Sequence, residues 1–235
     1  MCATICKNGP LWLRNWSQEE RSNRKDRVPI KKFICVIPRQ KAGDLSNVRY
    51  QAQGNRALDY PGTTRFPVIP LIWGYGQEGE EIRVIALSAD YDNCRCNLEL
   101  LKEELEALCK DRGLSCPKGV EVVEVPFDES LDSHIATFQK LIDRTEDGDD
   151  LYACLTFGSK PTPLVEVMAM QYAYRVHRDV TITCAVYGQM DHSVQPPAAK
   201  LYDITALITL DDIVRRLAEQ RVSDPKAVLD RILNL

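Results

Sequence analysis

Residues 151–170 read LYACLTFGSKPTPLVEVMAM, and the class of fold can be predicted from this stretch. It begins with the apolar run LYACLTF, which is typical of a strand buried on both faces of a sheet. A short segment with one glycine, one serine and one lysine follows, and two prolines then lead into a helical pattern. The stretch therefore predicts a strand, a polar turn and a helix, with the turn at the carboxyl end of the strand.

Five further runs rich in β-branched residues are predicted to be strands, and helical patterns separate them. Apolar residues recur at helical spacing between Leu98 and Leu108 and again between Leu131 and Ile142. Strands that alternate with helices indicate right-handed βαβ units and a sheet covered on both faces. We therefore expect an α/β, Rossmann-like fold with a six-stranded, mainly parallel sheet. The predicted strands cover residues 33–38, 82–88, 120–126, 151–157, 180–188 and 202–208.

The chain divides into three expected parts: an N-terminal extension (1–31), a Rossmann-like domain (32–208) and a short helical tail (209–235). The charged run of residues 17–32 is interpreted as a solvated lead-in, with a phosphate-binding arm as the alternative. The first crossover, 39–81, is long and rich in glycine and proline. We expect it to contain one irregular helix near 63–73 and a loop over the edge of the sheet.

The tail is predicted to contain two short helices. Thr209 with Asp212 resembles a capping box before the first helix, and Ser223 with Pro225 is a start signal for the second.

The composition is that of a soluble globular protein, with 44% hydrophobic and 27% charged residues in a chain of 235. A formal net charge of −4 argues against a protein that coats long nucleic acid. The nine cysteines form no paired CxxC units, so we expect reduced cysteines, no metal and no cofactor in a cytoplasmic protein. No apolar run is long enough for a membrane span, and the N-terminus lacks the apolar region of a signal peptide.

The turn after LYACLTF has the chemistry of an anion site. Thr162 is expected to be the N-cap of the following helix and Pro163 its first residue. The amides at such a turn point outward with the positive end of the helix dipole. Gly158 allows a close approach of the backbone, Ser159 offers a hydroxyl, and Lys160 adds a compact positive charge. We interpret the turn as a phosphate site.

A plain connection with a solvated lysine would have the same spacing, and this alternative stays open. The sequence contains no GxGxxG after its first predicted strand and no GxxxxGK[ST] motif, so two common phosphate-binding devices are absent from it.

The helix after the turn, residues 163–176, is apolar on nearly all sides. Such a helix must be covered on more than its sheet side. Another element of the same chain could cover it, but we favour a homodimer interface. Two copies of the Lys160 turn would then meet across a symmetry axis and form one site for a two-fold ligand.

The order of elements and three segments resemble the CARF domain (CRISPR-associated Rossmann fold) of type III CRISPR systems. The segments are DDLYACLTFGSKPTPLVEVMAM, VTITCAVYGQ and LYDITALITLDDIV, and the similarity covers roughly residues 32–212. The run Thr156-Phe157-Gly158-Ser159-Lys160-Pro161 is similar to the family's Thr-Gly-Gly-Thr-Lys-Pro type loop. Phe157 stands in place of a glycine and Ser159 in place of a threonine.

The resemblance implies a homodimer that binds cyclic oligoadenylate, a ring of four or six AMP units (cA4 or cA6), in a cleft over the strand ends. It implies that Gly158, Ser159 and Lys160 hold the ring phosphates, and that the exits of strands one, two and five add contacts. The implied ligand-binding residues are Arg39, Gln40, Ser88, Ala89, Thr156, Phe157, Gly158, Ser159, Lys160, Tyr187 and Gly188.

Two functions from different classes are compatible with these residues. The first is a sensor that passes ring binding to a fused or separate effector through the helical tail. The second is a metal-independent ring nuclease, in which a ribose 2'-hydroxyl attacks the adjacent phosphate and leaves a 2',3'-cyclic phosphate. In that case Lys160 would stabilise charge, and Ser159 or Arg39 would orient the phosphate. A Rossmann-like enzyme for another nucleotide is the third hypothesis.

The histidines do not point to a further catalytic domain. No R-x4-H ribonuclease motif is present, because Glu129, Tyr172 and Tyr187 stand five residues before the three histidines. Structural or surface roles are therefore expected for His134, His177 and His192.

Overall fold

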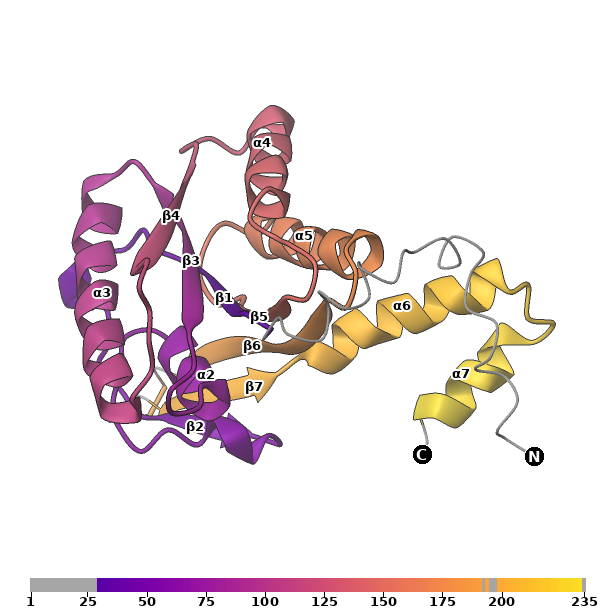
Figure 1. Ribbon diagram of the computed structural model, residues 1–235, viewed down its shortest axis with the longest axis horizontal. Helices are drawn as coiled ribbons and strands as arrows, with labels where there is room; N and C mark the ends of the chain where they lie inside the picture. The colour runs from indigo at the N-terminus through magenta and orange to yellow at the C-terminus, as the bar shows by residue number, and fades with distance from the viewer. Residues whose placement is uncertain (1–28, 192, 195–197, 234–235) are drawn as a thin grey trace, which may run out of the picture.

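The computed structural model describes residues 29–191, 193–194 and 198–233, and Figure 1 shows their arrangement. This part of the chain is an α/β structure whose seven strands form one mostly parallel sheet in the order β2-β7-β6-β5-β1-β3-β4. The strands are β1 (Lys31–Val36), β2 (Tyr50–Gln53), β3 (Ile82–Ala89), β4 (Val120–Val125), β5 (Asp150–Cys154), β6 (Thr181–Asp191) and β7 (Ala198–Asp203). The helices are α2 (Val68–Tyr75), α3 (Asp92–Arg112), α4 (Leu131–Ile142), α5 (Thr162–Val176), α6 (Thr205–Glu219) and α7 (Pro225–Leu233), with short 3-10 turns η3 (Ala42–Asp44) and η4 (Arg56–Leu58).

The central strands are mostly apolar because their side chains alternate between two helix layers. On β1, Phe33 and Cys35 lie in one core together with residues of α2 and α3. Ile34 and Val36 lie in a second core with residues of α4 and α5. Figure 1 shows these two helix pairs on opposite sides of the sheet. The five strands from β6 to β4 are parallel, which brings their carboxyl ends to one edge of the sheet.

The prediction of six strands is wrong, because the described part of the chain has seven. The additional strand, β2, lies in the first crossover and pairs only with β7, to which it is parallel. Its sequence YQAQ is short and half polar, so it lacks the apolar pattern by which the other strands were predicted. The helix expected near residues 63–73 is α2, which begins at Val68.

The last predicted strand, 202–208, is wrong in its second half. Strand β7 ends at Asp203, and α6 begins at Thr205. The Thr205 hydroxyl donates to Asp203 Oδ1 (2.6 Å) and accepts a hydrogen bond from the Ala185 N–H (2.8 Å), which fixes the turn between strand and helix. Thr209 is therefore not a cap but lies within α6, where its hydroxyl donates to the Thr205 carbonyl. A short apolar run does not by itself distinguish a strand from a helix.

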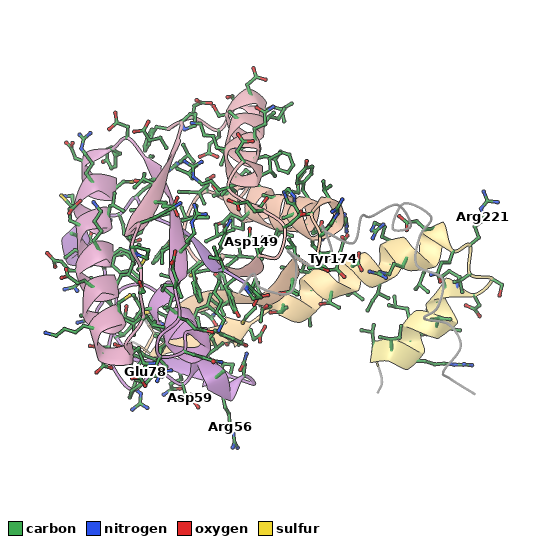
Figure 2. All side chains as sticks on the ribbon, in the orientation of Figure 1. Arg56, Asp59, Glu78, Asp149, Tyr174 and Arg221 are labelled. Carbon is green, nitrogen blue, oxygen red and sulfur yellow. The ribbon has the colours of Figure 1, made fainter. Side chains whose placement is uncertain are left out.

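Helices α6 and α7 extend away from the sheet, and the last strand leads directly into them (Figure 1). Ile208 is buried near the start of α6, and Asp211 accepts hydrogen bonds from Gln171 and Arg175 of α5. Farther along, Figure 2 shows Arg221 at the outer end of this projection. Among the described residues, no helix has the length and apolar character needed to cross a membrane.

A buried ion pair lies at the amino end of the central strands, opposite the edge where the parallel strands end. The ammonium of Lys32 is 2.7 Å from Asp149, and both side chains are only 1% exposed. Lys32 also donates to the carbonyl of Arg144 (2.8 Å). Figure 2 shows Asp149 inside the molecule. Because each charge is paired and hydrogen-bonded, we assign this cluster a structural role.

Candidate functional site

The carboxyl ends of β1, β3, β4 and β5 meet at one edge of the sheet, where ligands bind in open parallel α/β structures. A small cavity of about 20 Å³ opens there. The exits of β1, β4 and β5 line it together with the first turns of α4 and α5. The lining residues are Arg39, Val125, Pro126, Asp128, Ser133, His134, Thr137, Ser159, Thr162 and Val165.

The turn between β5 and α5 presents Gly158 and Lys160 to solvent, while Ser159 is half-buried. Gly158 has φ +103°, and a Cβ at this position would lie 3.0 Å from Thr162 Cβ, so only glycine fits without strain. The Ser159 and Thr162 hydroxyls are hydrogen-bonded at 2.9 Å. The helix begins at Thr162 after Pro161 as N-cap, so the prediction that Thr162 is the N-cap is wrong. The exposed turn keeps the groups expected of an anion site.

Arg39 follows β1 and is held in place by α3. The side-chain amide of Asn93 donates to the carbonyl of Arg39 (3.0 Å), and the amide of Asn97 donates to the carbonyls of Pro38 (2.8 Å) and Gln40 (2.9 Å). These bonds fix the backbone around Arg39, which lines the cavity at the strand ends. Gln40 is exposed.

Two residues that sequence reasoning did not select, Glu129 and His134, lie beside Arg39. Arg39 Nη1 donates to Glu129 Oε1 at 3.1 Å, and the guanidinium lies 4.8 Å from the centre of the Phe127 ring. His134 Nε2 is 3.3 Å from Glu129 Oε2. The Ser159 hydroxyl, and then Arg39, hold the pKa of the Glu129 carboxyl below its usual range. The β4 exit loop is thus part of the site, and its run of acidic residues after a predicted strand was the signal for it.

The other expected ligand-binding residues occupy different environments. Ser88 and Ala89 belong to β3 rather than to a loop after it, and both are buried. The Thr156 hydroxyl accepts a hydrogen bond from the N–H of Gly188 (2.9 Å), so it ties the turn after β5 to β6. Phe157 packs against both hydrophobic cores.

Tyr187 and Gly188 were expected at the exit of the fifth predicted strand (180–188), but both lie well within β6, which continues to Asp191. Gly188 is buried, and a Cβ there would lie 2.8 Å from Pro67 Cγ. Tyr187 is 44% exposed. Strand β6 is longer than predicted because its outer half pairs with β7, from Val186 opposite Asp203 onward.

An exposed apolar stripe begins at Leu164, the third residue of α5, close to the turn Gly158-Ser159-Lys160. Leu164, Met168, Tyr172 and Val176 recur at a spacing of four and are 62%, 50%, 36% and 56% exposed. The ring of Tyr172 meets Phe138 of α4, with centroids 6.0 Å apart. On α4, Leu131 and Ile135 are 72% and 46% exposed as well. Contiguous apolar surface of this kind is typical of an interface.

Within the described ranges, no group of three or more His, Cys, Asp and Glu residues is arranged to hold a metal ion. No protein-family model matches the chain, and no curated protein is significantly similar to it.

Proposed function

We propose that this chain is a CARF-type sensor with a Rossmann-like domain, which binds cyclic oligoadenylate at a homodimer cleft. The observation that carries the proposal is the exposed turn Gly158-Ser159-Lys160 at the strand ends, with Arg39 from the neighbouring strand beside it. Backbone amides, a hydroxyl and two kinds of cation are the groups with which proteins hold phosphates. The ring size, four or six AMP units, is left to experiment.

The apolar stripe supports the homodimer. Leu164, its first residue, stands four positions after Lys160, so self-association through the stripe would bring the two turns near one axis. A closed dimer presents each side chain twice, which suits a ring that carries the same phosphate several times. A signal to an effector would leave through the projecting helices α6 and α7.

A ring nuclease is the second candidate, and the exposed Lys160 next to the Ser159 hydroxyl favours it. In this reaction a ribose 2'-oxygen forms a bond to phosphorus while the bond from phosphorus to the 5'-oxygen breaks. The products are a 2',3'-cyclic phosphate and a 5'-hydroxyl, and the attacking hydroxyl gives up the proton that the leaving oxygen gains. Lys160 would stabilise the charge on the phosphate, and Ser159 or Arg39 would orient it.

The first test is ring binding and ring cleavage by the Lys160→Ala variant. We expect its affinity for the labelled cyclic tetra- or hexa-adenylate to fall by about 10- to 100-fold, the value of one or two hydrogen bonds to a charged group. Binding is measured by fluorescence anisotropy, and products are separated on a gel. Intact ring with wild-type protein indicates the sensor, whereas linear products that disappear in the variant indicate the nuclease.

The matched control is Lys226→Ala on α7, where the lysine is 82% exposed and pairs with its helix neighbour Asp230. This control should bind like wild type. If wild-type protein binds neither ring, the proposed function is wrong, and a Rossmann-like enzyme for another nucleotide becomes the better hypothesis.

A further inference from the structure

The anion-binding groups at the strand ends already hold one anion, the carboxylate of Glu129. Arg39 Nη1 lies 3.1 Å from Glu129 Oε1, and His134 Nε2 lies 3.3 Å from Glu129 Oε2. Ser159 lines the same cavity as Arg39 and His134, and its hydroxyl lowers the pKa of the Glu129 carboxyl. Three polar groups from three parts of the fold, the exit of β1, helix α4 and the turn after β5, therefore lie around one cavity, and two of them lie within ion-pair distance of Glu129.

The contact between His134 and Glu129 leaves one hydrogen-bonding group of the histidine ring unsatisfied. Nε2 is buried, yet it lies outside hydrogen-bond geometry even though the carboxylate is within ion-pair distance. Glu129 itself is 45% exposed and Arg39 30% exposed, so their attraction is weakened by solvent. A buried ring nitrogen that faces an anion without a good hydrogen bond can gain from a better-placed oxygen.

The carboxylate of Glu129 is not needed to build the loop that carries it. Asp128 Oδ1 accepts the N–H of Ser130 (2.8 Å), and the Ser133 hydroxyl donates to Asp128 (2.8 Å). The Ser130 hydroxyl caps α4 by accepting the N–H of Ser133 (3.2 Å). Because these bonds fix the turn and the helix start, the Glu129 side chain can rotate away while the loop stays in place.

We infer that Arg39, His134 and Ser159 form a phosphate subsite, and that Glu129 occupies it in the ligand-free protein as an internal competitor. A phosphate offers the same acceptor oxygens as a carboxylate and carries charge of the same sign. Both anions cannot sit at one subsite, so a bound phosphate must displace Glu129. His134 thereby becomes a phosphate-contacting residue rather than a surface one. The identity of the physiological ligand rests on the proposed function, but the competition itself does not.

The test compares wild type with Glu129→Gln, which keeps the size of the side chain and removes its charge. Inorganic phosphate is titrated at constant ionic strength and followed by amide NMR signals of residues around Ser159. We expect the dissociation constant to fall about 5-fold, which corresponds to the roughly 1 kcal/mol of a partly exposed charge pair. Asp143→Asn, at the far end of α4, changes the net charge equally and should leave the constant unchanged.

A second variant establishes which groups receive the phosphate. His134→Gln in the Glu129→Gln background should remove most of the gained affinity, because it takes away one of the inferred donors. Unchanged or weaker phosphate binding by Glu129→Gln would overturn the inference, and so would the absence of shifts near Ser159 in both proteins. Tighter phosphate binding without any binding of cyclic oligoadenylate would support the subsite while contradicting the proposed function.

Discussion

Glu166 of α5 lies in the core with an exposed fraction of 0%, and neither of its carboxylate oxygens has a hydrogen-bond partner among the described residues. Burial raises the pKa of this carboxyl well above its usual value, since the charged form loses its hydration. Burial therefore favours the neutral acid in the folded protein. A carboxyl in such surroundings destabilises the fold increasingly as the pH rises.

We predict that Glu166→Gln removes this pH dependence. The folded state binds the Glu166 proton more tightly than the unfolded chain does. The folded state of wild type therefore has its full stability below about pH 4 and loses stability as the pH rises above that value. Between about pH 5 and pH 7, the free energy of unfolding of the variant should gain on wild type by up to about 1.4 kcal/mol per pH unit. Urea unfolding of both proteins at three pH values measures this difference, and parallel curves would contradict it.

Some single residues could be predicted from the sequence and others could not. The position of Gly158 and Lys160 in a turn after a strand followed from the apolar run before them, and the structure exposes both. Glu166 stood in a helix that reads as apolar, and no spacing indicates that its carboxyl has no partner. Glu129 and His134 belong to the candidate site only because the β4 exit loop lies close to Arg39. This proximity depends on the order of the strands rather than on local sequence.

At the scale of elements, helix α5 has one apolar face that is buried in the core and a second apolar face that is exposed. Val165, Ala169 and Ala173 face the sheet and lie in its second core. Its apolar stripe faces outward, together with exposed residues of α4. The prediction of an all-round apolar helix is thus explained by a core face and an outer face. The homodimer through the outer face stays a proposal.

We predict that Met168→Glu breaks this association. A carboxylate would be buried twice, once from each chain, in the middle of the interface, and buried unpaired charges are costly. The dimer dissociation constant should rise about 100-fold or more. Analytical ultracentrifugation measures it, and Val214→Glu on α6 is a matched control because Val214 is 48% exposed and Met168 is 50% exposed. Equal sedimentation of Met168→Glu and wild type would exclude this face as the interface.

The elements that the sequence predicted well are those with a strong period. Continuous apolar runs identified the central parallel strands, whose neighbours bury both faces, and leucine spacing identified α3. Strand β2 was not predicted because it pairs on one side only and carries polar residues. The segment 202–208 was assigned to a strand because apolar composition fits both states, and the Asp203–Thr205 turn decided the outcome.

At the scale of the whole molecule, the two ends of the sheet differ in character. The amino end of the central strands holds the buried pair of Lys32 and Asp149, which satisfies its own charges. At the carboxyl end, Lys160 is exposed and Arg39 pairs with the Glu129 carboxylate, which we infer a bound phosphate displaces. The opening for an anion and the apolar stripe lie on neighbouring parts of the same surface, so ligand binding and self-association are expected to depend on each other.

Native mass spectrometry of the full chain, mixed separately with cyclic tetra-adenylate and cyclic hexa-adenylate, measures how many chains share one ring. We predict a complex of two chains and one ring for one of the two ligands, because the paired turns around Lys160 would form a single pocket. A complex of one chain with one ring, or a dimer that carries two rings, would contradict the composite site.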